Sequence, residues 1–536
     1  MHAYVLRPEG RAEKDISKRY YKDRGDGGTL EWPIDAGEGL GTVGAWNVLF
    51  RLGLHPRWLD PEHAHGVRKG DTVFAVADSH LTTAYRSAIG TLIGHGATVV
   101  VSGSMRAWAE YLPKEACPET VANDYPYAAL AWVAAGRKPQ VIAPPGWPYA
   151  RIAKSENFKT IGLLVAIRGE RQSPERALVT PLPNAPALVQ YGQLFFLNGS
   201  PFAAFQAWLQ GQESLNPWLQ WRHRLFWLDE FVSDLAGVFR DHGILAEPDF
   251  ADTPGALPST TVILRHDLDH SRDTSYMELE RREGVPAVHA VLKDENTAFW
   301  LKVLRNAPNH EVAFHYNTGQ YGRWREAIRK RLGLRARSYR PDRKSVVGNG
   351  LLRQVRWAKR RGIGVATLHR HLGFLIYPEW IDAMHRVFEA EPEVLGASSL
   401  FRAQVLRWGN ECVDGAVSTS GEFPDSQFPY WFPFKLAHAG LGGLPLRGWE
   451  TTSVMEIEPE LFEQMLDHQV PMLRQRVFSI IYHPAHAHRP TFSPNGSLAW
   501  WREILRIIRE RGIKVMTPRD LFMRLNAQIE KENSFE

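Results

Sequence analysis

Apolar and polar positions in the first 200 residues alternate between two spacings. Apolar residues recur at helical spacing over 46–54 and 81–96, and these segments contain a terminating glycine, Gly53 and Gly96. Residues 71–78 and 97–103 are instead short, nearly continuous apolar runs that are typical of buried strands. Because helices and strands take turns, the pattern predicts βαβ connections and a parallel sheet. We expect residues 1–200 to form an α/β domain of flavodoxin-like type.

The pattern changes near residue 200. Two further strand-like runs, 160–167 and 190–198, complete the first domain, and apolar residues then recur at helical spacing. The positions that predict an amphipathic helix pair are Phe205, Trp208, Leu209, Trp218, Trp221, Leu225, Phe226, Leu228, Phe231 and Leu235. A turn-rich segment over 249–260 follows. We therefore expect a helical connector over 201–255 and a second domain over 256–536.

In the second domain, apolar strands repeatedly end at residues that bind metals or protons. The segments are 261–269, which delivers Asp267 and Asp269, 309–315, which delivers His315, and 477–483, which delivers His483. Because successive side chains of a strand point to opposite faces, Asp267 and Asp269 share one side of the backbone. Two carboxylates this close are costly unless a cation or a proton lies between them. The pattern therefore predicts a metal site with a proton acceptor beside it.

Composition limits the class of protein, the possible metal ligands and the possible partners. A chain of 536 residues, with 44% hydrophobic and 23% charged residues, is typical of a globular protein of several domains. No apolar run approaches the ~20 residues that span a bilayer, and the charged start lacks a secretory pattern, so we expect a cytoplasmic protein. Cys117 and Cys412 lie far apart, so histidines and carboxylates must hold any metal. The net charge of +5 is dispersed, which argues against a nucleic-acid partner, and the oligomeric state stays open.

Residues 265–269, 310–316 and 482–484 together resemble the NodB-homology polysaccharide deacetylases, in the branch that carries Arg-His-Asp-x-Asp. The resemblance spans residues 261–525 and implies a C-terminal distorted, incomplete (β/α) barrel. It also implies a divalent metal, usually zinc. The roles it implies are general base for Asp267, metal ligand for Asp269 and His315, and general acid for His483.

One position departs from the family pattern. The family's second metal-binding histidine lies four residues after the first, where this chain has Gly319. Either His310 or His371 could supply the missing nitrogen. Otherwise the metal site is degraded or absent.

Other residues are expected around this centre. We expect Arg265 to contact the substrate, together with Tyr430 and Trp431 of an aromatic, Pro-rich loop. This loop forms either a substrate-stacking surface or a hydrophobic plug, because its prolines exclude a regular helix or a central strand. His486 and His488 stay open as alternative proton donors.

These residues predict a hydrolase that removes an acyl group from an N- or O-acylated carbohydrate. A metal would polarise the acyl carbonyl, a carboxylate would take the proton of the attacking water, and an imidazole would protonate the leaving group. Two alternatives remain open. One is hydrolysis of a non-sugar cyclic amide on the same barrel, and the other is an inactive glycan-binding or scaffold protein.

The first domain carries a separate resemblance. Residues 90–104 are similar to a segment of glutamine-amidotransferase-like domains. Such enzymes need a cysteine in a G-x-C-x-G turn, and neither Cys117 nor Cys412 lies in one. We therefore expect residues 1–200 to be non-catalytic.

Overall fold

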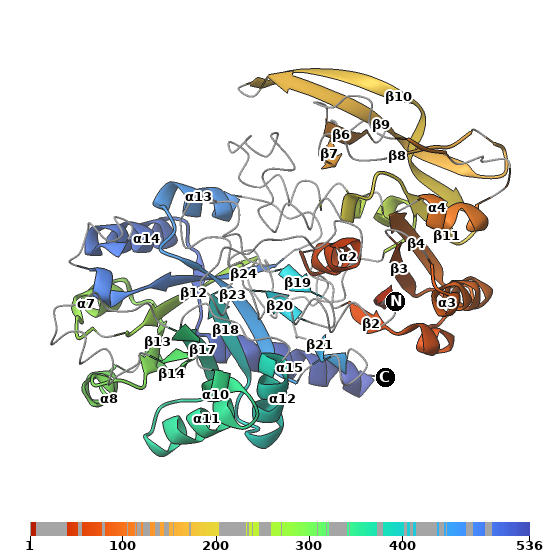
Figure 1. Cartoon of the computed structure of the whole chain (residues 1–536). Helices are drawn as coiled ribbons and strands as arrows, with labels where there is room; N and C mark the ends of the chain where they lie inside the picture. The colour runs from red at the N-terminus through yellow and green to blue at the C-terminus, as the bar shows by residue number, and fades with distance from the viewer. Residues whose placement is uncertain are drawn as a thin grey trace, which may run out of the picture.

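The computed structural model of the chain contains two large β-sheets, each with helices packed beside it (Figure 1). It describes residues 2–6, 40–51, 56–77, 81–103, 105–112, 114, 119–121, 129–133, 140–143, 149–153, 155–170, 173–202, 232, 235–237, 239–245, 259–269, 271–307, 309–317, 319–320, 340–341, 343–371, 379–400, 405–407, 411–413, 437–438, 444–445, 447–467, 475–487 and 496–535. The predictions on Tyr430, Trp431 and His488, and most of the predicted helix pair, lie outside these ranges. None of the helices within them is both long and apolar enough to cross a membrane.

The first sheet has nine strands and is parallel in one half only. Its parallel half consists, in order, of β2 (Arg57–Leu59), β1 (Ala3–Leu6), β3 (Thr72–Ala77), β4 (Thr98–Gly103) and β11 (Leu194–Leu197). The sheet continues through antiparallel pairs to β10 (Ser173–Tyr191), β9 (Lys159–Glu170), β6 (Ala129–Val133) and β7 (Gln140–Ala143). The expectation of a parallel sheet is therefore wrong for the second half. A tight turn at Gly192, with φ of 57°, joins β10 directly to β11 as a hairpin, which forces antiparallel pairing.

The predicted elements of the parallel half are present. Helix α3 (Thr83–Gly94) begins after Thr82, whose hydroxyl caps the helix by accepting from the backbone N–H of Tyr85. Helix α2 (Leu40–Arg51) lies beside β1 and β3 (Figure 1). Strand β3 is buried along its whole length, as its continuous apolar run predicts for a parallel strand covered on both faces.

The second sheet curls into a nearly closed barrel of parallel strands, as the family resemblance implies. Its strands are β12 (Thr260–Asp267), β13 (Ala287–Leu292), β14 (His310–Asn317), β17 (Thr367–His371), β18 (Gly396–Leu400), β23 (Trp449–Met455), β24 (Arg476–Tyr482) and β25 (Lys514–Val515). From β12 to β24 each strand pairs in parallel with the next, and β24 pairs with β12 again, so the order returns to its start. The short β25 joins the beginning of β12.

Strand alternation sorts the side chains of this barrel between its inside and its outside. Ile263 on β12 and Val477 on β24 belong to a small apolar cluster at the amino ends of the strands. Leu521 and Phe522 of helix α15 (Pro518–Phe535) complete this cluster and close that end of the barrel. The opposite, carboxyl end is therefore the end left for polar side chains.

Candidate metal and catalytic site

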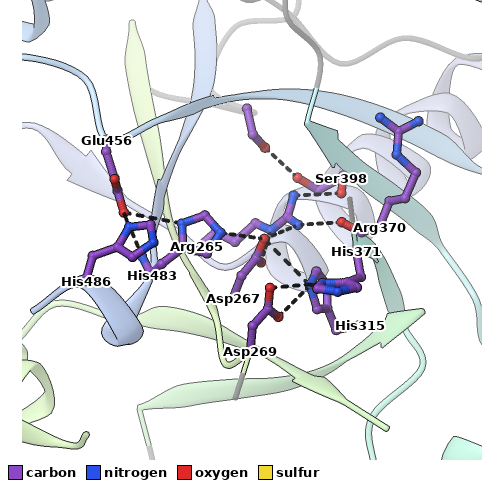
Figure 2. A network of polar contacts seen from close by, with 11 residues as sticks. Arg265, Asp267, Asp269, His315, Arg370, His371, Ser398, Glu456, His483 and His486 are labelled. Carbon is purple, nitrogen blue, oxygen red and sulfur yellow. Dashed lines mark hydrogen bonds and ion pairs between the residues drawn. The ribbon is translucent and has the colours of Figure 1, made fainter. Parts of the chain in front are cut away.

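Polar side chains gather at the carboxyl ends of the barrel strands (Figure 2). Those that the sequence singled out are Asp267 at the end of β12, Asp269 two residues later, His315 on β14, His371 at the end of β17 and His483 directly after β24. In (β/α) barrels this end is where catalytic groups usually lie. The structure thus brings together residues that are far apart in the sequence.

Asp269, His315 and His371 form the tightest group in this set. One oxygen of Asp269 lies 3.0 Å from Nε2 of His315, and the other lies 2.9 Å from Nδ1 of His371. The same two ring nitrogens lie 3.1 Å apart. All three residues meet the geometry of a metal-binding group. The structure therefore brings His371 to Asp269 and His315.

The donor atoms of this group fit a divalent transition metal. Zn–N and Zn–O bonds of about 2.0–2.1 Å at tetrahedral angles place neighbouring donors about 3.3 Å apart, close to the separations found here. Two imidazoles and one carboxylate suit zinc-like ions better than magnesium or calcium. Without a cation, at most one proton can lie between the two facing ring nitrogens. His371 on one side and His315 on the other, with Asp269, would therefore hold the ion.

Asp267 lies beside this group and is held by Arg265. Arg265 donates from Nε to one carboxylate oxygen at 2.7 Å and from Nη2 to the other at 2.9 Å. Burial raises the pKa of Asp267, but the charges of Arg265, His315 and His483 outweigh it, so the pKa lies below its ordinary value. Oδ2 of Asp267 is 3.8 Å from Nε2 of both His315 and His483. The ionised carboxylate of Asp267 thus lies between His315 of the donor group and His483.

The side chain of Arg265 is fully buried, and it also donates hydrogen bonds to the backbone carbonyls of Ser398 and Arg370. Arg265 therefore positions Asp267 from inside the barrel. Its expected contact with a substrate stays a prediction.

A third carboxylate, Glu456, holds His483. Its Oε1 lies 3.3 Å from Nδ1 of His483 and 2.6 Å from Nδ1 of His486. Burial lowers the pKa of His483, but the hydrogen bond to Glu456 and the charge of Asp267 raise it to about 9. Burial likewise raises the pKa of Glu456, whereas the two imidazoles lower it to about 2. His483 is therefore a protonated acid at neutral pH, with Glu456 ionised behind it.

Sequence reasoning missed Glu456, and it left His310 open as one of two possible metal ligands. Glu456 directly follows β23, so it carries the same signal as the other site residues, a polar group at the end of an apolar strand. Its φ of 45° is unusual for a residue other than glycine and aims the carboxylate at His483. His310 begins β14, at the opposite end from His315, and its Nδ1 lies 3.0 Å from His289. The structure therefore does not bring His310 to Asp269.

Comparisons with known proteins add few matches. No protein-family model matches the chain, and no curated protein matches it. Among solved structures, the α-L-fucosidase isoenzyme 2 from Paenibacillus thiaminolyticus is similar over 42% of this chain and 32% of its own length, with 14% identity and a TM-score of 0.27. The Bc1960 peptidoglycan N-acetylglucosamine deacetylase, solved with 4-naphthalen-1-yl-N-oxidanyl-benzamide, is similar over 49% of this chain and 93% of its own length, with 10% identity and a TM-score of 0.27. The chain thus spans less than a third of the matched fucosidase and most of the matched deacetylase.

Proposed function

We propose that this protein is a metal-dependent hydrolase that removes an acyl group, such as acetyl, from an N- or O-acylated carbohydrate. One observation carries the proposal. The ionised carboxylate of Asp267 lies 3.8 Å from His315, a member of the possible metal-binding group, and 3.8 Å from the protonated His483. Hydrolysis of an amide or ester is accelerated by a base that takes the proton of the attacking water and an acid that protonates the leaving group. The sequence resemblance to NodB-homology deacetylases supports the choice of an acylated sugar.

The residues of this chain divide the work of such a reaction. When bound by Asp269, His315 and His371, a divalent ion, most simply zinc, supplies Lewis acidity that polarises a carbonyl and acidifies water. Asp267 accepts the proton of the attacking water, and Arg265 keeps its carboxylate oriented and ionised. His483 donates a proton to the departing nitrogen or oxygen.

The balance of the reaction needs no covalent enzyme intermediate. Water adds to the acyl carbon, the bond from that carbon to nitrogen or oxygen breaks, and the products are a carboxylic acid and a free amine or alcohol. After the products leave, Asp267 loses the proton that it gained and His483 regains a proton, both by exchange with solvent. Glu456 stabilises the charged form of His483 before the transfer.

Release of acetate by the purified full-length protein tests the proposal. The substrates are N-acetylated chito-oligosaccharides, O-acetylated xylo-oligosaccharides and, as a third class, a cyclic imide, each with one equivalent of added Zn²⁺. Because ring opening of the imide releases no acetate, its turnover is followed by the loss of the intact ring. We expect acetate from at least one acetylated sugar and none from the Asp269→Ala variant. Turnover of the cyclic imide alone would replace the sugar with a non-sugar amide. Absence of turnover in all three, with zinc bound, would refute the proposal.

A further inference from the structure

A second group of histidines lies on the outer face of the same strands. Arg265 and Asp267 point into the barrel, so the residue between them, His266, points outward. His266 on β12 pairs in register with His289 on β13, which places both imidazoles on this outer face. Their ring centroids lie 4.8 Å apart. The group is therefore separate from the site inside the barrel, although it shares a strand with it.

A neighbouring helix and strand complete this group. Helix α7 (Ser275–Glu283) turns Tyr276 and Glu280, which lie four residues apart, toward the sheet, and both are fully buried. Nε2 of His266 lies 2.5 Å from one oxygen of Glu280, and Nδ1 of His310 lies 3.9 Å from the other. Nε2 of His289 lies 3.0 Å from Nδ1 of His310. Three imidazoles and one carboxylate thus converge from four different elements.

The surroundings of the group are apolar and closed. His266, Glu280 and His289 are fully buried, and the side chain of His310 is only 7% exposed. The rings of Tyr276, Tyr482 and Trp501 surround His266 at centroid distances of 4.4, 5.7 and 5.2 Å. Burying a carboxylate among such groups is costly unless it is paired with a charge or binds a metal.

Some polar atoms of this group lack the hydrogen bonds that buried polar atoms normally make. Oε2 of Glu280 is buried and has no hydrogen-bond partner in the part of the chain that the structure describes. The facing nitrogens of His289 and His310 compete for at most one shared proton. A cation between the carboxylate and these nitrogens would satisfy all of them at once.

We propose that His266, Glu280, His289 and His310 form a second, buried site for a divalent transition-metal ion, with a structural role. His266, Glu280 and His289 each offer a donor atom, and these atoms lie within 4.8 Å of one another. An imidazole-rich donor set selects zinc-like ions over magnesium or calcium. A bound ion would tie β12, β13, β14 and α7 together, and the closed surroundings leave no entry for a substrate.

The protonation states support metal binding. Burial lowers the pKa of His289 well below its ordinary value, and the charges of His266 and His310 lower it further. Burial also lowers the pKa of His310. Both rings are therefore neutral, the form that binds metals. The hydroxyl oxygen of Tyr276 lies 3.0 Å from Nδ1 of His289, so it can accept a hydrogen bond from Nδ1–H and leave the lone pair of Nε2 free for the ion.

Cobalt binding to the metal-free full-length protein separates the two sites. The background is the double variant Asp269→Ala and His371→Ala, which removes two of the three donors inside the barrel. We expect this variant to bind one equivalent of Co²⁺ with the visible spectrum of a buried, nitrogen-rich site, and to melt at a higher temperature when loaded. Adding Glu280→Gln should abolish both the spectrum and the rise in melting temperature.

Two further variants keep the test decisive. His310→Gln changes the least buried member of the group, so it gives the answer if Glu280→Gln does not fold, and it should also abolish the spectrum. Glu311→Gln is the matched control, because it alters the next residue of β14, whose carboxylate bonds Thr367 instead, and cobalt binding should be unchanged. If the background variant binds no cobalt, or if His310→Gln and Glu280→Gln both leave binding intact, the second site is refuted. Metal binding and turnover at the site inside the barrel are measured separately in wild-type protein, so the proposed function stands or falls independently.

Discussion

At the scale of single residues, burial and neighbouring charges shift the pKa of Asp267 in opposite directions. Its carboxylate is buried, which by itself favours the neutral acid. The bidentate guanidinium of Arg265 reverses this preference. Asp267 is therefore available as a base at pH values where a buried carboxyl without such a partner would be protonated.

Replacing Asp267 with asparagine tests its role as the base. The amide keeps the shape of the side chain but cannot accept a proton, so kcat for acyl hydrolysis should fall by about 10²–10⁴-fold. Zinc content, measured by elemental analysis, should be unchanged, because Asp267 is outside the group formed by Asp269, His315 and His371. Loss of the metal in this variant would make Asp267 a ligand instead.

The Glu456→Gln variant tests how His483 is kept protonated. His483 must carry a proton to act as an acid, so the wild-type rate should fall as the pH rises through its pKa of about 9. Removing the carboxylate removes a hydrogen bond and a charge that raise this pKa. The alkaline limb of the kcat/KM profile should therefore move to lower pH. The same limb in Glu456→Gln as in wild-type protein would exclude Glu456 as a positioning residue.

At the scale of elements, β12 shows how one strand serves two polar groups. Because its side chains alternate, β12 directs Arg265 and Asp267 into the barrel and His266 against α7.

The ion pair of Arg265 and Asp267 is buried, and a buried ion pair that loses one partner leaves an uncompensated charge. The contribution of Asp267 to stability is complete above its unfolded-state pKa of about 4 and disappears as the pH falls through its lowered folded-state pKa.

The Arg265→Met variant should therefore lose stability at neutral pH. We expect a decrease of about 3–5 kcal/mol in the free energy of unfolding, measured with urea, because the carboxylate of Asp267 stays buried without its partner. Arg281→Met is the matched control, since Arg281 pairs with Glu278 on the exposed face of α7 and should matter little. Equal stability of Arg265→Met and wild-type protein would contradict the assigned role of the pair.

The elements also show which features could be predicted from sequence. The continuous apolar runs of β3, β4, β12 and β24 predicted buried parallel strands, because such strands are covered on both faces. The antiparallel half of the first sheet was not predictable, since apolar spacing does not say which strands pair. Likewise, spacing could not choose between His310 and His371, because the partner of His315 lies 56 residues away on another strand.

At the scale of the whole molecule, α15 closes the amino end of the barrel while the site lies at the carboxyl end. Phe522 is fully buried in the apolar cluster that α15 completes. Phe522→Ala should lower the free energy of unfolding by about 3–5 kcal/mol, because it leaves a cavity between the helix and the strands. Zinc content of the folded protein should not change. Met523→Ala, at the exposed neighbouring position, is the control and should change stability little. A similar loss in both variants would mean that α15 does not seal the barrel.

The closure of the barrel by β12 and β24 also sets the order in which the protein can be completed during synthesis. Thr260 and Arg476, which pair across these strands, are 216 residues apart in the chain. Strand β12 leaves the ribosome long before its partner β24. The edge of β12 that pairs with β24 therefore stays unpaired until every strand between the two has been made. Asp267 therefore meets His483 only when the last part of the barrel has been made. Nascent chains that stop before β24 would expose an unpaired strand edge and carry no complete site, which makes the synthesis of β24 the step at which both folding and activity are decided.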